Sequence, residues 1–133
     1  MTSPFSLENI QQRQDHLKSL LKAHGLSAFA LNAGKSQAYL TGMHFHLMER
    51  PVVAILTPDK APVLILPDFE KGKTEDLGYA LRVFTYGEDP AKWEQSFQQA
   101  GAALGLSDGA VGVEENQMRV LELRYLEAAL PNA

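Results

Sequence analysis

Two runs of β-branched and aliphatic residues constrain the fold of this chain more than any other feature. The runs cover Val52–Leu56 and Val63–Leu66, and the linker between them, Thr57–Pro62, carries two prolines and an aspartate. Short apolar runs of this kind are typical of strands, and proline and aspartate are typical of turns. The pattern therefore predicts an antiparallel β-hairpin, and any sheet built around it contains at least one antiparallel pair.

Helical periodicity appears before and after this hairpin. The first 24 residues contain an amphipathic helix that is expected to start near Leu7 and to end at Gly25, in the left-handed conformation. Its expected buried positions are Ile10, Leu17, Leu20 and Leu21. A second helix is expected to be capped by Asp89, to start at Pro90 and to bury Trp93, Phe97, Ala100 and Leu104. A C-terminal helix, ending before Pro131, is expected to bury Met118, Leu121, Tyr125, Leu126 and Ala129.

The remaining elements are short. Further strands are predicted over Ala28–Asn32, Leu81–Tyr86 and Ala110–Glu114, one helical turn over Ser36–Leu40, and a helical stretch between Pro67 and Leu77. Helices and strands alternate along the chain, which predicts a sheet flanked by helices. Because of the hairpin, that sheet is expected to be mixed rather than wholly parallel.

Length and charge narrow the class of protein. With 133 residues, 45% of them hydrophobic and 21% charged, the chain has the size and composition of one globular domain. Its formal net charge of −4 argues against a broad phosphate-binding surface, so we expect no nucleic-acid partner. No apolar run approaches the roughly 20 residues of a membrane helix, so no membrane partner is expected. The absence of cysteine is compatible with a cytoplasmic protein.

The segment between the predicted helical turn and the hairpin carries the main candidate chemistry. His44 and His46 are two residues apart, so in an extended backbone both side chains leave the same face. Such a pair could bind a metal ion with Glu49 as the nearest further ligand, could contact a substrate in a cleft, or could line the rim of a pocket. The spacing alone favours the rim.

Arg50 stands directly before Pro51, a position that favours an extended backbone. Its guanidinium could hold a carboxylate through two parallel hydrogen bonds. The alternative is an exposed arginine paired with Glu49 or another acid, and spacing alone favours this simpler interpretation.

Four acidic residues lie at predicted strand ends. Asp68 and Glu70 could serve as catalytic carboxylates, but capping of a helix explains them equally well. Glu114 and Glu115 sit at a strand end, where ligands often gather, but a solvated acidic pair is the simpler interpretation. Up to this point the residues predict only an α/β domain with a suggestive histidine and arginine segment.

The order of these motifs resembles the N-terminal domain of the creatinase and Xaa-Pro peptidase family, the metalloenzymes with the "pita-bread" fold. The resemblance covers nearly the whole chain. Its motifs are Arg13 with Leu17–Leu21, Gly25–Ala28, Tyr39–Gly42, the hairpin, Pro67–Glu70, the strand ending at Tyr86, and Gly112–Glu114. Bacterial Xaa-Pro dipeptidases are similar in a further respect, because their Tyr-Leu-Thr-Gly turn is followed by a run that ends in glutamate and arginine, matched here by Glu49 and Arg50.

The resemblance implies a three-layer, ribonuclease H-like α/β fold, with a mixed central sheet of about five or six strands flanked by helices. It also implies that residues 1–133 form a non-catalytic domain, and that a catalytic domain absent from this chain holds two divalent metal ions (Mn, Co or Zn). The implied parent hydrolyses the bond before proline in a peptide substrate, and it is expected to be a homodimer.

In such a dimer the N-terminal domain of one subunit resembles a lid over the active site of the other. Arg50 is then expected to contact the carboxylate end of the substrate or to shape the entrance to its pocket, with Glu49 beside it. His44 and His46 are added to this substrate-binding rim by our own inference. Two alternatives stay open: the N-terminal domain of a creatinase-like C–N hydrolase, and a catalytically dead binding module of the same fold.

Overall fold

The computed structural model describes residues 5–106 and 108–133. Its α-helices are α1 (Leu7–Ala23), α2 (Lys35–Thr41), α3 (Trp93–Leu104) and α4 (Val120–Ala129). Its strands are β1 (Leu26–Asn32), β2 (Val53–Leu56), β3 (Val63–Pro67), β4 (Arg82–Tyr86) and β5 (Ala110–Val113). Two 3₁₀ helices complete the set, η1 (Asp68–Thr74) and η2 (Pro90–Lys92). The predicted elements are therefore confirmed in type and order.

The strands of the described residues form one mixed sheet in the order β4-β3-β2-β1-β5. The hairpin is antiparallel, with Val53 opposite Ile65 and Ile55 opposite Val63, and β2 is also antiparallel to β1. The outer pairs, β1 with β5 and β3 with β4, are parallel. All four β2 residues and all five β3 residues are buried, because helices cover both faces of the sheet.

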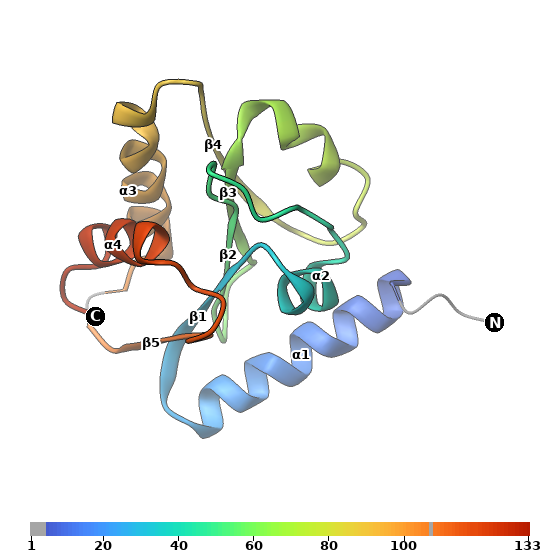
Figure 1. Cartoon of the computed structure of the whole chain (residues 1–133). Helices are drawn as coiled ribbons and strands as arrows, with labels where there is room; N and C mark the ends of the chain where they lie inside the picture. Colours follow the sequence, from blue (N-terminus) through green and yellow to red (C-terminus); the bar gives the residue numbers. More distant parts are fainter. Residues whose placement is uncertain (1–4, 107) are drawn as a thin grey trace.

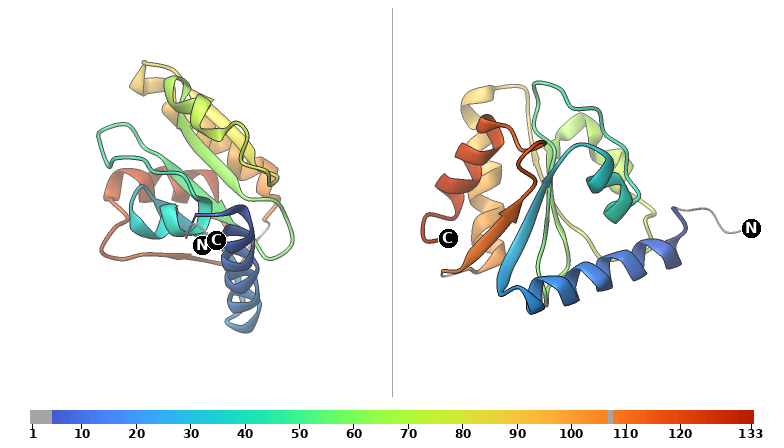
Figure 2. Two further views of the ribbon diagram at one scale, coloured as in Figure 1. Left: turned by 90° about the vertical axis from the view of Figure 1, so that its right-hand side faces the viewer. Right: turned by 60° about the horizontal axis from the view of Figure 1, so that its bottom comes forward.

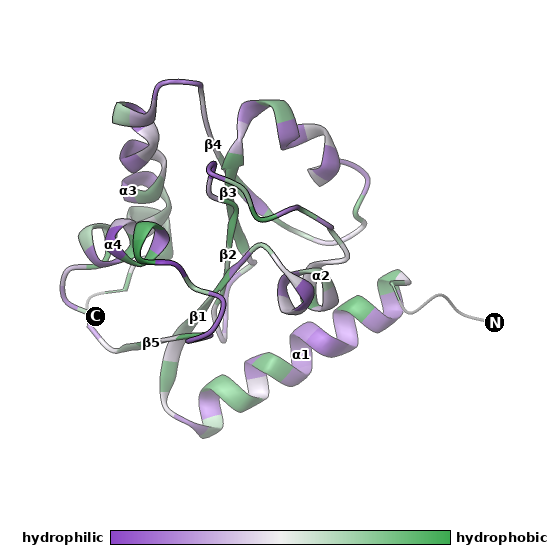
Figure 3. Cartoon of the chain, in the orientation of Figure 1, coloured by the Kyte–Doolittle hydropathy of each residue, from purple (hydrophilic) through white to green (hydrophobic). Residues whose placement is uncertain are grey.

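The helices form two layers with the sheet between them. In Figures 1 and 2, α3 and α4 cover one face, while α1 and α2 cover the other. The side chains of each strand point alternately to the two faces of the sheet. Val53 and Ile55 pack on the same side as α3, whereas Ala54 and Leu56 pack on the opposite side. Figure 3 shows hydrophobic residues along the central strands, while hydrophobic and hydrophilic residues alternate along α1. The predicted three-layer arrangement is confirmed.

Glycine places the turns after two helices. Gly25 follows α1 with φ +67° and Gly42 caps α2 with φ +76°, both in the left-handed region. The backbone N–H of Gly42 donates to the carbonyl of Ala38 (2.8 Å). The expected ending at Gly25 and the expected turn at Gly42 are thus confirmed.

Two side chains expected in the core are exposed instead. Leu20 of α1 and Leu121 of α4 face solvent, whereas Gln14 and Glu122 are buried on the inner faces of the same helices. The prediction was wrong because it counted only apolar residues. Gln14 is buried with its amide donating to the carbonyl of Leu40 (2.9 Å), which compensates the cost of burial.

Helix starts also differ from prediction in detail. Asp89 accepts a hydrogen bond from the N–H of Ala91 (3.1 Å), but it caps the 3₁₀ turn η2, and α3 begins only at Trp93. The predicted helical stretch after Pro67 is the 3₁₀ helix η1. Within the described ranges, none of the helices combines the length and apolar character needed to cross a membrane.

Candidate functional site

One edge of the sheet gathers most of the polar groups singled out in the sequence. Strands β1, β3, β4 and β5 end there and antiparallel β2 begins there, so we call it the C-terminal edge. Ligands of α/β sheets commonly bind outside the C-terminal ends of parallel strands. The segment 42–50, between α2 and β2, crosses this edge.

Two tyrosines fix the segment 42–50 at its two ends. The hydroxyl of Tyr79 donates to the carbonyl of Thr41 (2.6 Å), and the hydroxyl of Tyr86 donates to the carbonyl of Pro51 (2.5 Å). Burial raises the pKa of Tyr79 to about 12 and raises the pKa of Tyr86 further still. Both phenols therefore stay protonated, and remain donors, at neutral pH.

The side chains of this segment alternate between inside and outside. Met43 and Phe45 are buried, while His44 and His46 are exposed on the same side, as the two-residue spacing predicts. Lys73 supports the segment by donating to the carbonyl of His44 (3.1 Å). The segment is thus extended and attached through its apolar residues, with its histidines facing outward.

The two histidines line a pocket of about 410 Å³, together with Lys35 and Tyr39. The His44 ring also packs edge-on against Phe5, with ring centroids 4.8 Å apart. Arg50 is not among the residues that line this pocket. The four predicted site residues therefore divide into a histidine pocket and a separate arginine cluster.

Arg50 is held by two carboxylates and an aromatic ring. Its Nη2 donates to Glu88 (2.6 Å) and its Nη1 donates to Glu49 (3.3 Å). The ring centroid of Phe69 lies 5.5 Å from its Cζ, within range of a cation–π contact. The expected pairing with Glu49 is present, and Glu88 adds a shorter contact that raises the pKa of Arg50.

Glu88 is brought to Arg50 by the way β4 ends. The indole N–H of Trp93 donates to the carbonyl of Gly87 (3.0 Å), and the hydroxyl of Ser96 donates to the carbonyl of Thr85 (2.7 Å). These bonds attach the end of β4 to α3. Sequence analysis missed Glu88, although its place directly after a predicted strand that ends at this edge was an available signal.

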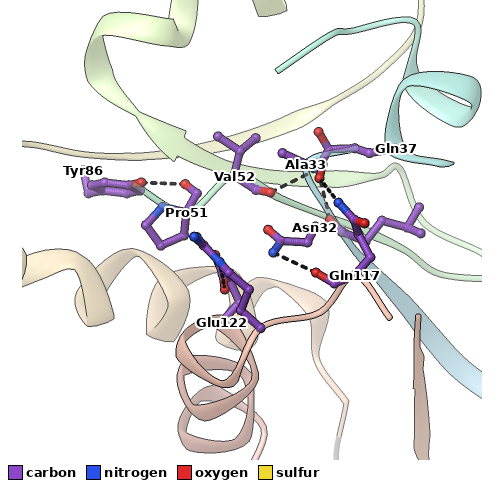
Figure 4. A network of polar contacts seen from close by, with 10 residues as sticks. Asn32, Ala33, Gln37, Pro51, Val52, Tyr86, Gln117 and Glu122 are labelled. Atoms are coloured by element: carbon purple, nitrogen blue, oxygen red, sulfur yellow. Dashed lines mark hydrogen bonds and ion pairs between the residues drawn. The ribbon is translucent and has the colours of Figure 1, made fainter. Parts of the chain in front are cut away.

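A buried ion pair lies beside the arginine cluster. Glu122 is fully buried, and both of its carboxylate oxygens accept hydrogen bonds from Arg119, whose pKa is raised by this contact. Figure 4 shows Glu122 on the α4 side of the edge. The sequence carried a weak signal for this pair, because Glu122 occupies the third position of α4, where acidic residues commonly cap helices.

An amide network closes the gap between the ends of β1 and β5. Asn32 donates to the carbonyl of Gln117 (3.3 Å), and Gln117 donates to the carbonyl of Ala33 (2.7 Å), as Figure 4 shows. A Cβ on Gly34 would lie 2.6 Å from Nε2 of Gln117, so a larger residue there would push this amide away from Ala33. The crevice where α/β folds often bind ligands is therefore occupied by the protein's own side chains.

The remaining acidic candidates have structural partners or face solvent. Glu70 pairs with Lys73 (3.1 Å), and Asp68 is exposed in the first turn of η1. Glu114 accepts a hydrogen bond from Ser36 (2.6 Å), so it is not part of a solvated pair with the exposed Glu115 as we had expected. The reason is that the end of β5 lies next to the start of α2.

The C-terminal edge combines one guanidinium with carboxylates and two exposed histidines. Across the described part of the chain, no group of three or more histidine, cysteine, aspartate or glutamate side chains could hold a metal ion. A guanidinium flanked by carboxylates can exchange its partners, but it cannot cleave a bond by itself.

The family model "Creatinase/Prolidase N-terminal domain" matches residues 13–133. Comparison with curated protein sequences finds no match. Among solved structures, the N-terminal domain of an X-Pro dipeptidase from Streptococcus pyogenes is similar, with 20% identity over 92% of this chain and 96% of that one, and a TM-score of 0.76.

Longer structures match over only part of their length. A dipeptidase from Mycobacterium ulcerans is 23% identical over 95% of this chain and 33% of that one, with a TM-score of 0.75. A dipeptidase from Pyrococcus horikoshii is 18% identical over 89% of this chain and 32% of that one, also with a TM-score of 0.75. The chain thus spans about a third of the length of these two dipeptidases, and at such identities the likeness shows the fold.

Proposed function

The chain belongs to the creatinase/prolidase N-terminal domain family, and we propose that it is the non-catalytic N-terminal domain of an Xaa-Pro dipeptidase- or aminopeptidase-like metallohydrolase. The matched dipeptidases are about three times as long as the region that they share with this chain. We call the protein in which this domain is joined to a catalytic domain the full-length parent. Substrate hydrolysis belongs to the parent, and access of substrate is the task of the domain described above.

The arrangement of Arg50 carries this proposal. The guanidinium lies at the C-terminal edge on a segment that tyrosines fix at both ends, and it is 27% exposed. A rigidly carried cation of this kind is suited to bind the carboxylate end of a dipeptide. Glu49 lies beside Arg50, and we assign the two histidines, which lie apart from Arg50 on the same segment, to the path by which the substrate approaches.

The two divalent metal ions implied for the family (Mn, Co or Zn) are assigned to the catalytic domain of the parent. The donor set required for them does not come together among the residues described for this chain. When bound, such ions activate water for attack on the peptide bond. The task of this domain is to orient the substrate and to limit its access.

The first experiment tests whether the domain is non-catalytic by itself. The 133-residue chain, supplied with manganese or cobalt, is expected to leave an Xaa-Pro dipeptide intact, whereas the full-length parent hydrolyses it. Turnover by the isolated chain above a metal-only blank would refute the claim that the domain is non-catalytic. A parent that is folded but inactive on C–N bonds would instead favour the binding module.

The second experiment tests whether the domain acts across a homodimer. One parent variant carries Arg50→Ala, and a second carries a substitution of a metal ligand in its catalytic domain. If Arg50 serves the partner's active site, mixed dimers regain activity, because one of their two sites has both an intact arginine and an intact metal centre. A mixture that stays at the level of the separate variants would place Arg50 in its own subunit's site or outside both.

A further inference from the structure

We propose that Glu88 is a built-in substitute for the ligand carboxylate at Arg50, which it covers until an external carboxylate displaces it. The inference rests on the proposed function in one respect, namely that the natural ligand is a substrate carboxylate. Exchange of carboxylates at Arg50 can be measured on the isolated chain, independently of that assumption.

The N–H groups of Arg50 differ in whether a ligand can reach them. A guanidinium has five N–H donors. Its Nε is buried and has no hydrogen-bond partner among the described residues, so a ligand cannot reach that donor from outside. The two terminal nitrogens are the accessible ones, and each already donates to a glutamate, Nη2 to Glu88 and Nη1 to Glu49. One N–H group of each terminal nitrogen is engaged in this way, so an external carboxylate that approaches from the side of the two glutamates competes with them.

The two side chains of the Arg50–Glu88 pair differ in how freely they can move. The Arg50 side chain is 27% exposed and packs near Phe69, whereas the side chain of Glu88 is 76% exposed. The backbone on either side of Glu88 is fixed, by the bond from Trp93 to the carbonyl of Gly87 and by the Asp89 cap. Displacement of Glu88 therefore requires only a change of its rotamer, which in exposed side chains takes picoseconds to nanoseconds. The equally exposed Glu49 can leave in the same way.

The exposed pair is also weak enough to be exchanged. Exposed ion pairs contribute little net free energy, because water screens the charges and ordering two long side chains costs entropy. A ligand carboxylate that binds both terminal nitrogens replaces two single contacts by one two-pronged contact of better geometry. The Arg119–Glu122 pair provides the contrast, because Glu122 is fully buried and cannot be solvated when its partner leaves.

The test uses the isolated chain with acetate as the probe. The side-chain Nε–H signal of Arg50 is followed by NMR while sodium acetate replaces sodium chloride at constant ionic strength. In the Glu88→Gln variant we expect acetate to bind about two- to five-fold more tightly, the range that an exposed ion pair supplies. Glu127→Gln removes the same charge from an exposed pair with Arg124 and serves as the control, with no change expected.

Weaker or unchanged acetate binding in Glu88→Gln would overturn the proposal. If Glu88 serves instead to orient Arg50, Glu88→Gln weakens acetate binding, and the proposal is wrong. Unchanged binding, or no binding of acetate to either the wild type or the variant, also overturns it.

Kinetic measurements on the full-length parent distinguish a failure of this inference from a failure of the proposed function. With a dipeptide substrate we expect Glu88→Gln to lower KM by about the same two- to five-fold while kcat stays constant. If acetate exchange behaves as expected in the isolated chain but neither Glu88→Gln nor Arg50→Ala affects the parent, Arg50 binds carboxylates and the proposed function fails. If Arg50→Ala impairs the parent while Glu88→Gln raises KM, the proposed function stands and the inference on Glu88 fails.

Discussion

The two ends of the sheet hold their arginines in different ways. At the end opposite the C-terminal edge, Arg82 donates to the carbonyl of Ala61 through Nε (3.2 Å) and Nη2 (2.9 Å), and to the carbonyl of Ala103 through Nη1 (2.9 Å). Lys60 donates beside it to the carbonyl of Leu104 (3.0 Å), so both cations lie at the C-terminus of α3. Arg50, at the C-terminal edge, contacts two exposed glutamates instead.

Under the proposed function, the difference separates a structural arginine from one that a ligand can reach. The carbonyls that Arg82 contacts belong to fixed backbone and cannot turn away, so Arg82 keeps these partners in the folded chain. Glutamate side chains can turn into water, so Arg50 can change partners. This contrast predicts that substitutions at one end of the sheet affect stability, whereas those at Arg50 affect recognition.

The largest expected loss of stability is at Arg119. This arginine lies at the C-terminal edge but, unlike Arg50, pairs with a buried carboxylate. Arg119→Met leaves Glu122 buried without a partner, and we expect the free energy of unfolding to fall by about 3 kcal/mol, the lower end for a broken buried pair because Arg119 is 32% exposed. Urea denaturation measures this change. Arg124→Met, in an exposed pair on the same helix, is the control, and an equal loss in both variants would contradict the account.

The next largest effect is expected at Arg82. Arg82→Met keeps an apolar stem but removes three hydrogen bonds from a charged donor, so we expect a loss of about 2 kcal/mol in the same assay. The matched variant Arg50→Met is expected to leave the urea midpoint unchanged. If Arg50→Met destabilises the chain as much as Arg82→Met, the division between the two ends of the sheet is wrong.

A smaller effect is expected at the tyrosine that fixes Pro51. Tyr86→Phe removes one buried hydrogen bond and is expected to cost about 1 kcal/mol. Because this bond fixes the segment that carries Arg50, hydrogen exchange of the amides in 42–50 should also become faster. Unchanged exchange there, with stability reduced, would show that Tyr86 does not hold the segment in place.

Alkaline pH should loosen the same segment from its other end. The pKa of Tyr79 is raised above that of the unfolded chain, to about 12, so its contribution to stability is complete below about pH 10 and is lost as the pH rises towards 12. Since the phenol is only half-buried, we expect the loss to be about 1 kcal/mol or less. Tyr79→Phe should show a smaller decrease between pH 10 and 12, and an identical decrease would contradict this assignment.

The fold was largely predictable because its signals are local. The hairpin, the order of helices and strands, and the turns at Gly25 and Gly42 follow from short apolar runs and from glycine. Burial within the helices was less predictable. Leu20 and Leu121 are exposed because Gln14 and Glu122 occupy inward positions, which depends on partners that periodicity does not reveal.

The candidate site was predictable only in part, for the same physical reason. The shared face of His44 and His46 follows from their spacing, and the pairing of Arg50 with Glu49 follows from adjacency. The contact between Arg50 and Glu88 joins residues 38 positions apart, and only the parallel pairing of β3 and β4 brings the end of β4 to this edge. The position of Glu88 after a predicted strand places it at this edge, but its pairing with Arg50 cannot be predicted from a single sequence.

The value of kcat/KM for an Xaa-Pro dipeptide in the full-length parent tests the central claim most directly. The Arg50→Ala variant is compared with the wild type and with Arg124→Ala, after urea denaturation has shown that all three are equally stable. We expect kcat/KM of Arg50→Ala to fall by about ten-fold or more, as for the loss of a charge-assisted hydrogen bond to substrate, while Arg124→Ala is unaffected. An unchanged kcat/KM in Arg50→Ala would show that this arginine does not contact the substrate.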